Sequence, residues 1–538
     1  MIEGFHIMCK DRSRSQMTRV LAVVVLAVAA FGVLTHQGRQ TASAVPPGGD
    51  WPQWGRDHTR NMVTTHQGLP VDFSPGKFLG RSDEIDMAST LNVKWIAELG
   101  SQAYGNTTIA DGRVYIGTNN DLPRDPKYKD DRSVVYCLDE KTGELIWQLA
   151  VPKLGTGKVS DWEFLGICSS PAVVGSFVYV VTNRCEVVCL DVHGMANGND
   201  GPFTDEAKYL GGSGKPPIQP GPTDADIIWI YDMLGELGIF PHNVTSSSAL
   251  VHDGAVYVST SNGVDWSHVD IPNTRAPCLI KLDARTGELL GEEASGISQR
   301  ILHCNWSSPA YGDRGGRGVV LFGAGDGFCY GFDPEPVKDE EGFGVLKELW
   351  RFDCNPQQYR FKDNKPIKYG KSKGPSEIIA TPVFYKGRAY AVIGQDPEHG
   401  EGVGTLSCID VSQSGHITDP VWQYRGIERS ISTPSIEDDL LYVADYTGFI
   451  HCLDVNTGDL LWKHDTLGHI WGSTLVADGK VFIGNEDGFL TILATGRKLQ
   501  KMGEVEFPAP IYSSAVAANG VLYVATQSHL YAFSEGGT

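Results

Sequence analysis

Short apolar runs alternate with polar turns along most of the chain, and the same order of runs returns many times. A typical unit begins with a strand of small residues, turns at Asp-Gly or an equivalent, and continues with a β-branched and aromatic strand. After a loop, a third strand ends in Leu-Asp, a Thr-Gly turn follows, and a fourth strand carries tryptophan. Each unit therefore predicts a four-stranded antiparallel sheet.

Three stretches show the repeat most clearly. Residues 136–150 read YCLDEKTGELIWQLA, residues 451–465 read HCLDVNTGDLLWKHD, and residues 280–294 read IKLDARTGELLGEEA, with Gly291 at the tryptophan position. The equivalent residues Asp410 and Asp454 lie 44 residues apart, a spacing that suits a propeller blade rather than a helical repeat. The chain holds eight units, whose first strands begin near Asn106, Ser169, Ser246, Ser307, Ala380, Ser432, Gly472 and Ser513.

The last unit contains three strands, and the missing fourth strand is found near the other end of the chain. The stretch LNVKWIAELG (Leu91 to Gly100) carries Trp95 and has no unit of its own. Pairing it into the last sheet closes the ring and removes exposed strand edges. We therefore expect an all-β fold over residues 91–538: an eight-bladed β-propeller of four-stranded antiparallel blades, closed by an N-terminal strand.

The first 44 residues differ from the rest of the chain. Basic residues precede an apolar run from Val20 to Leu34, and Ala42 to Ala44 offer small residues for a signal peptidase. The run of about fifteen residues is short for a membrane span of roughly twenty. Residues 1–44 are predicted to be a signal peptide, with a retained anchor as the alternative, and residues 45–90 an extension that packs on the propeller. The protein is thus expected to be exported, periplasmic or extracytoplasmic, and to have no membrane span after cleavage.

Charge and cysteine content narrow the choice of partners. The formal charge of −20 argues against nucleic acid and anionic membranes as binding partners. We expect the protein to be a monomer. Four of the eleven cysteines precede the repeat aspartate by two residues, and this shared position predicts small buried thiols that stay unpaired: Cys137, Cys189, Cys408 and Cys452. Pairing of Cys168, Cys185, Cys304 and Cys354 is left open.

The repeated Asp-x-x-Thr-Gly-x-x-x-Trp phrase resembles the pyrroloquinoline quinone (PQQ) repeat family, over nearly all of residues 51–534. That family includes quinoprotein alcohol dehydrogenases and a non-enzymatic outer-membrane assembly propeller, and DWPQWGRDHTRN (Asp50 to Asn61) resembles the start of its mature dehydrogenases. The resemblance implies that the repeat residues dock neighbouring blades: Asp139, Gly143, Trp147, Asp454, Gly458, Trp462 and Trp95. The aspartates of this phrase are expected to accept hydrogen bonds from the following turn.

The sequence departs from the dehydrogenases of this family at the positions that serve their chemistry. It contains no pair of adjacent cysteines, no Cys-x-x-Cys-His haem attachment and no recognisable Glu, Asn and Asp set for calcium. Two hypotheses follow. The favoured one is an exported propeller that binds a ligand or protein partner without turnover. The alternative is a PQQ-dependent dehydrogenase, oxidising an alcohol or sugar at an atypical site with PQQ and calcium.

A candidate site lies on one face of the predicted propeller. The segments that join blades and the loops between second and third strands emerge on this face, where long loops commonly carry binding. Their large polar and aromatic residues predict a ring around a funnel: His242, Asn243, His303, Asn305, Trp306, Glu377, Arg429, His469, Trp471 and Tyr512, together with Tyr104 and Glu163. The alternative interpretation is that these residues bind no ligand and are polar because the mouth of the central channel is solvated.

Two metal sites and one class of ligand are further hypotheses for this funnel. His242, His303 and His469 come from three blades and would bind a metal if the fold brings them together. Asp396, Glu398, His399 and Glu401 would bind calcium through oxygens, although a solvated loop is the preferred interpretation. A small anionic or aromatic ligand, PQQ first, is expected to pair with arginine and histidine and to stack on indole.

Overall fold

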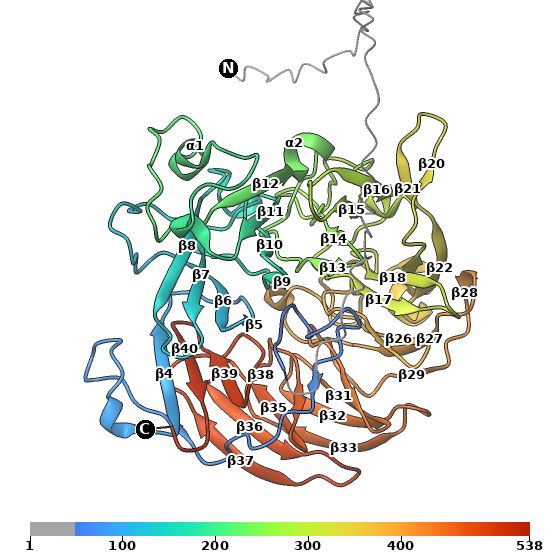
Figure 1. The fold of residues 1–538 in the computed structure, drawn as a ribbon. Helices are drawn as coiled ribbons and strands as arrows, with labels where there is room; N and C mark the ends of the chain where they lie inside the picture. The colour runs from blue at the N-terminus through green and yellow to red at the C-terminus, as the bar shows by residue number, and fades with distance from the viewer. Residues whose placement is uncertain (1–48, 538) are drawn as a thin grey trace, which may run out of the picture. The chain divides into compact units, whose positions relative to one another are not determined.

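The computed structural model describes residues 49–537, whose strands form eight four-stranded blades around a ring (Figure 1). The predicted signal peptide lies outside the described residues. The first blade consists of β5 (Thr108–Ala110), β6 (Arg113–Asn119), β7 (Arg132–Asp139) and β8 (Leu145–Pro152), and the second of β9 (Ala172–Val174), β10 (Phe177–Val181), β11 (Glu186–Asp191) and β12 (Ile227–Asp232). The third blade consists of β13 (Leu250–His252), β14 (Ala255–Ser259), β15 (Leu279–Asp283) and β16 (Leu289–Glu293), and the fourth of β17 (Ala310–Asp313), β18 (Gly318–Gly323), β19 (Phe328–Phe332) and β22 (Glu348–Asp353).

The second half of the ring repeats the same order of strands. The fifth blade consists of β25 (Val383–Tyr385), β26 (Arg388–Val392), β27 (Leu406–Asp410) and β29 (Trp422–Tyr424), and the sixth of β30 (Ser435–Glu437), β31 (Leu440–Ala444), β32 (Phe449–Asp454) and β33 (Leu460–Asp465). The seventh blade consists of β34 (Leu475–Ala477), β35 (Lys480–Gly484), β36 (Phe489–Ala494) and β37 (Lys501–Glu506), and the eighth of β38 (Val516–Ala518), β39 (Val521–Ala525), β40 (His529–Phe533) and β4 (Val93–Glu98). The predicted eight-bladed fold is confirmed.

The ring is closed by β4, which supplies the fourth strand of the last blade. It pairs antiparallel with β40, in a register that sets Ile96 opposite Tyr531 and Ala97 opposite Leu530. Closure thus joins the two ends of the propeller within one sheet. The predicted closure by an N-terminal strand is confirmed.

A few elements lie outside this repeat. Three blades are extended at an edge by additional strands. β1 (Val63–Thr64) pairs with β34, β21 (Gly344–Leu346) pairs with β16 and with β20 (Val337–Lys338), and β28 (Gly415–Ile417) pairs with β22. Two short hairpins and three short α-helices also lie outside the blades: β2 (Ser74–Pro75) with β3 (Thr90–Leu91), β23 (Phe361–Lys362) with β24 (Lys365–Pro366), α1 (Glu206–Gly211), α2 (Met233–Leu237) and α3 (Gln357–Arg360). Within residues 49–537, no helix has the length and apolarity needed to cross a bilayer.

The hydrophobic core lies between neighbouring blades, and a tryptophan marks five of these junctions. In each, an indole on the fourth strand donates a hydrogen bond to a backbone carbonyl of the next blade, at 2.8–3.2 Å: Trp95 to Glu140, Trp147 to Val192, Trp229 to Ala284, Trp422 to Val455 and Trp462 to Gly496. The indole of Trp95 also covers Gly143, where a Cβ atom would lie 2.7 Å from the ring. Asp139 accepts hydrogen bonds from the amides of Lys141 and Thr142, as expected for the turn.

At two junctions a basic side chain, and not an indole, donates the hydrogen bond to the next blade. Gly291 leaves one indole position empty, and there Lys281 donates to the carbonyl oxygen of Pro334 at 2.7 Å. At the next junction Arg314 donates to the carbonyl oxygen of Val411 at 2.8 Å. The indole nitrogen of Trp350, on the fourth strand of the same blade as Arg314, is buried without a partner. A repeat pattern alone therefore does not identify every docking residue.

The small residues that open each unit form a ring of hydrogen bonds around the axis. At six of the eight junctions a backbone amide donates to a side-chain oxygen of the next blade, at 2.7–3.1 Å: Ser170 to Ser248, Ser248 to Ser308, Thr381 to Thr433, Thr433 to Ser473, Ser473 to Ser514, and Ser514 to Asn106. Small hydroxyl side chains suit this position, because the first strands crowd together near the axis.

The segment that precedes the propeller contacts all eight blades. It uses one backbone or side-chain contact per first strand or following turn, at 2.7–3.0 Å: Trp51 with Ile109, Pro52 with Val173, Arg60 with Ala249, His58 with Tyr311, Thr59 with Phe384, Asn61 with Ile436, Met62 with Val476, and His66 with Asn519. The guanidinium of Arg60 is fully buried and also donates to the carbonyl oxygens of Trp54 and Pro309. Residues 51–66 thus tie the blades together at the inner strands.

Candidate functional site

A cavity of about 440 Å³ lies at the inner ends of the blades. Every blade contributes a residue to its wall: Asn106, Cys168, Ser246, Ser308, Thr381, Thr433, Ser473 and Ser514. Trp54, from the segment before the propeller, also lines the cavity and donates from its indole nitrogen to Thr381 Oγ1 at 2.9 Å. The volume is within the range of small-molecule sites.

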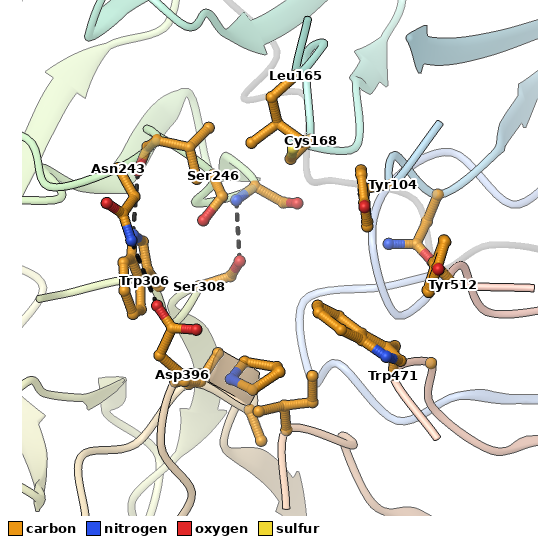
Figure 2. Close-up of a pocket in the computed structure, with 18 of the residues that line it drawn as sticks. Tyr104, Leu165, Cys168, Asn243, Ser246, Trp306, Ser308, Asp396, Trp471 and Tyr512 are labelled. Atoms are coloured by element: carbon orange, nitrogen blue, oxygen red, sulfur yellow. Dashed lines mark hydrogen bonds between the residues drawn. The ribbon is translucent and has the colours of Figure 1, made fainter. Parts of the chain in front are cut away.

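One side of this axial cavity is an aromatic wall (Figure 2). The rings of Tyr104 and Tyr512 stack with their centres 4.9 Å apart, and Trp471 meets Tyr512 edge to face at 5.2 Å. The indole nitrogen of Trp471 donates to Glu486 Oε2 at 3.0 Å, and Glu486 Oε1 lies 2.6 Å from His469 Nδ1. These bonds hold the indole in place, so the wall presents a fixed apolar surface to a ligand.

The opposite side carries Trp306, Asn243 and Asp396 (Figure 2). Asn243 Nδ2 donates to Asp396 Oδ2 at 3.3 Å, and burial raises the pKa of Asp396 above its ordinary value. The indole nitrogen of Trp306 donates to the carbonyl oxygen of Val244 at 3.0 Å. The cavity therefore combines an aromatic wall with a polar, acidic wall.

The charged residues of the cavity wall are all acidic. Among the described residues that line it, the charged side chains are Glu163, Asp396 and Glu398, and none is lysine or arginine. PQQ carries three carboxylates, which would lie against the carboxylates of this wall with no cationic side chain of the described wall to offset their charge. The residues present thus do not fit this quinone, and we derive no chemistry through it.

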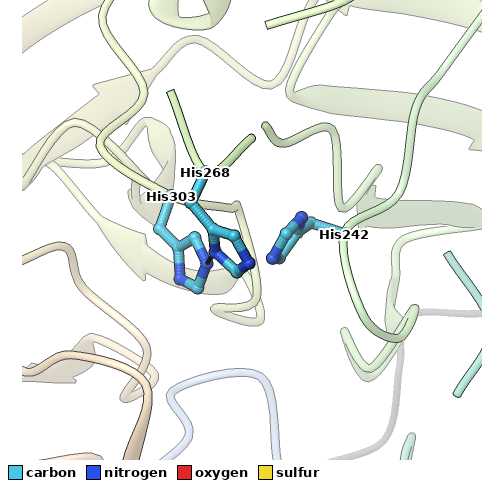
Figure 3. A group of neighbouring side chains, drawn as sticks. All are labelled: His242, His268 and His303. Atoms are coloured by element: carbon cyan, nitrogen blue, oxygen red, sulfur yellow. Dashed lines mark hydrogen bonds between the residues drawn. The ribbon is translucent and has the colours of Figure 1, made fainter. Parts of the chain in front are cut away.

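A second cluster lies beside the cavity and consists of three histidines (Figure 3). One ligating atom each of His242, His268 and His303 lies within 4.8 Å of the others. Burial lowers the pKa of His242 to about 4 and, with the neighbouring imidazoles, lowers that of His303 to about 2. Both rings are therefore neutral near pH 7, and the ring of His303 contacts that of Trp306 in the cavity wall at 5.2 Å between centres.

Six of the twelve predicted funnel residues line the axial cavity: Tyr104, Glu163, Asn243, Trp306, Trp471 and Tyr512. The others lie behind its wall. Asn305 is fully buried and bonds backbone groups of Asn262 and Gly325. Glu377, also fully buried, accepts hydrogen bonds from the amide of Cys304 and the hydroxyl of Tyr369.

Arg429 and His469 take positions that the sequence does not reveal. Arg429 is buried and donates to four carbonyl oxygens, those of Lys371, His399, Gly400 and Glu401, so its guanidinium braces two loops instead of facing the cavity. His469 stacks on Tyr446 and bonds Glu486. The hypothesis that His242, His303 and His469 share a metal is therefore wrong, because His469 is bound at the aromatic wall.

The residues missed by the sequence analysis are His268, Tyr369 and Trp54. His268 lies in the long loop SNGVDWSHVDIPNTRAP, between the second and third strands of its blade, and nothing in its spacing relates it to His242 or His303. In residues 49–537, these three histidines are the one group able to hold a metal with three or more His, Cys, Asp or Glu ligands. The acidic loop of Asp396, Glu398, His399 and Glu401 does not form such a group.

The cysteines do not form a site. All ten cysteines within residues 49–537 are free, including Cys168, Cys185, Cys304 and Cys354. The four thiols of the repeat position are buried and unpaired, as expected: Cys137, Cys189, Cys408 and Cys452. Burial raises the pKa of the Cys168 thiol, at the cavity wall, to about 12, so this thiol stays protonated near neutral pH.

Comparison with solved structures shows the fold. Quinohemoprotein alcohol dehydrogenase ADHIIG from Pseudomonas putida HK5 superposes with a TM-score of 0.57 at 13% identity, covering 91% of this chain and 81% of its own. A europium-containing methanol dehydrogenase gives 0.55 at 11% identity, covering 90% and 98%. BamB from Moraxella catarrhalis gives 0.49 at 15% identity, covering 80% and 99%.

Sequence comparison identifies the family. No curated protein matches the chain. The sequence profile of a family described as "Outer membrane protein assembly factor BamB" matches residues 83–197 and 348–537. Because these matches span more than half of the chain, the protein belongs to this family of PQQ-repeat propellers.

Proposed function

We propose that this protein is an exported propeller that binds a small flat ligand in the axial cavity without turning it over. The observation that carries the proposal is the cavity itself, with aromatic side chains on one side and carboxylates on the other. Export rests on the basic and apolar N-terminal segment and on the acidic composition.

The charge of the cavity wall determines which charge the ligand should carry. Its carboxylates favour a neutral or cationic molecule and disfavour an anion, since no basic side chain of the described wall offsets them. Tyr104, Trp471 and Tyr512 would stack on a planar ring, and indole and phenol faces also attract cations. Of the expected anionic or aromatic ligand, the aromatic class is kept and the anionic class is not, because Arg429 donates to loop carbonyl oxygens and does not line the cavity.

Calorimetric titration with three ligands that share one aromatic ring but differ in net charge tests the proposal. 1-Methylnicotinamide, which is methylated at the ring nitrogen, nicotinamide and nicotinate have similar shapes and charges of +1, 0 and −1. We expect the first two to bind and nicotinate to bind at least about tenfold more weakly. Trp471→Ala should weaken binding, whereas Trp266→Ala, which removes an indole that is 63% exposed and outside the wall, should not.

PQQ, with and without calcium, is the contrasting ligand. Tight binding of PQQ, followed by oxidation of an alcohol or sugar with an artificial electron acceptor, would replace the proposal with the dehydrogenase alternative. Binding of nicotinate as tight as that of the cation would refute the electrostatic argument.

A protein partner is a second candidate, on the loop-rich face around the cavity. Loops of this face expose large apolar side chains: Phe164, Trp266, Val269 and Leu467. The family description, an assembly factor, favours this candidate. If a protein partner binds this face, replacing these four side chains with serine should abolish binding of the partner to the purified protein. Binding of a small ligand in the axial cavity should be unchanged.

A further inference from the structure

Three histidines from different segments converge beside the axial cavity (Figure 3). His242 lies in the segment that leads into β13, His268 in the loop between β14 and β15, and His303 in the segment that leads into β17. One nitrogen from each ring lies within 4.8 Å of the other two. Segments separated by up to 61 residues thus bring three imidazoles to one point.

His242 is prepared for coordination by its hydrogen bond. Its side chain is fully buried, and Nδ1 lies 2.7 Å from the carbonyl oxygen of Val264. A carbonyl oxygen only accepts, so Nδ1 carries the hydrogen and Nε2 carries the lone pair. Nε2 is buried and has no partner in the protein. An unpaired buried acceptor is costly, which implies a missing partner.

His303 is oriented by a chain of two hydrogen bonds. The hydroxyl of Tyr369 donates to the buried carboxyl group of Glu377 at 2.9 Å, and the same oxygen lies 3.1 Å from His303 Nδ1. Since the hydroxyl hydrogen is used by Glu377, His303 Nδ1 is the donor and its Nε2 keeps the lone pair. Such outer hydrogen bonds on the second ring nitrogen are the usual support of metal-binding histidines.

His268 supplies the third nitrogen and the route for exchange. Its Nδ1 lies 3.2 Å from His303 Nε2. Two nitrogens bound to one tetrahedral ion at about 2.0–2.1 Å are separated by roughly 3.3 Å, so the two rings already have the spacing of ligands. His268 is exposed on its loop, and therefore it can change tautomer and release its hydrogen to water.

We propose that His242, His268 and His303 bind a divalent late transition metal, Zn²⁺ or Cu²⁺, through one nitrogen each. Imidazole nitrogens suit these ions, whereas Ca²⁺ and Mg²⁺ require oxygen ligands. Three protein ligands leave a coordination position for water or another ligand. The site does not depend on the ligand of the axial cavity, although the ring of Trp306 contacts both His242 and His303.

Zinc titration of the full chain tests the proposal. After treatment with a chelator, the protein should bind one equivalent of Zn²⁺ in calorimetry, and Co²⁺ should give the visible absorption of a four- or five-coordinate ion. His268→Ala is the most informative variant, because this side chain is exposed and its loss should leave the fold intact. It should weaken Zn²⁺ binding by at least about 100-fold, and Tyr369→Phe, which removes the support of His303, by about 10–100-fold.

His469→Ala is the matched control, because it removes a partly exposed histidine on the other side of the cavity. It should leave Zn²⁺ affinity unchanged. Absence of stoichiometric binding by the wild-type protein would overturn the proposal. Equal affinities of the wild-type protein and His268→Ala, with circular dichroism showing both folded, would also overturn it, since the ion would then be held elsewhere.

Discussion

The indole nitrogen of Trp95 lies 2.9 Å from the carbonyl oxygen of Glu140, and this bond joins the last blade of the propeller to the first. Trp95 is also the residue that covers Gly143. It therefore packs the junction at which the two ends of the propeller meet. The same pair of contacts gives a direct test of ring closure.

Trp95→Ala should lower the free energy of unfolding by about 3 kcal/mol or more, because it removes a buried indole and leaves the Glu140 carbonyl with Lys94 as its remaining side-chain donor. Urea denaturation measures the change. Trp266→Ala is the control, since that side chain is largely exposed. An unchanged midpoint for Trp95→Ala would mean that this junction does not support the ring.

Arg60→Met should destabilise the whole propeller. The buried guanidinium donates to the carbonyl oxygens of Trp54, Ala249 and Pro309, and a thioether leaves all three without a donor. With about 1–3 kcal/mol for each unsatisfied buried group, we expect a loss on the order of 3 kcal/mol. Arg285→Met, at an exposed position, is the control. Equal stability of the two variants would argue that the N-terminal segment is dispensable.

Alanine at any of the four repeat cysteines should cost on the order of 1 kcal/mol or less, since each change removes one buried atom of a small side chain. The positions are Cys137, Cys189, Cys408 and Cys452. Mass spectrometry of the non-reduced protein should find all four as thiols. A disulfide between any two of them would contradict the repeat geometry.

Glu293 predicts a pH dependence of stability. Burial raises the pKa of its carboxyl group to about 7, although the amides of Cys278 and Ser295 donate to it, whereas the unfolded chain titrates near the ordinary value of 4.5. Between these values the folded state holds more protons, so stability falls as the pH rises from about 4.5 to 7. The contribution is on the order of 3–4 kcal/mol, at ~1.4 kcal/mol per pKa unit.

Glu293→Gln removes this titration. The variant should lose less stability than the wild-type protein between pH 5 and pH 8, as measured by the free energy of unfolding in urea. If both proteins lose the same amount over this interval, other groups set the pH dependence and the carboxyl group of Glu293 is already ionised at low pH.

The number of blades, the closing strand and the buried cysteines were predictable from the sequence. Each depends on a local pattern that recurs around the ring, such as the aspartate turn at Asp139 or the cysteine two residues before it. Repetition makes such patterns visible even where one copy is weak. The missing last strand and the unassigned strand at Trp95 also matched each other in the sequence alone.

The site depended on the tertiary structure. His268 and His303 are 35 residues apart and share no spacing rule, and Arg429 is turned away from the cavity by four backbone carbonyls of neighbouring loops. Loops between blades do not repeat, so the direction of their side chains follows from contacts between distant segments. The local periodicity of the strands determines the propeller, whereas only the packing of its irregular loops decides which residues meet at the axis.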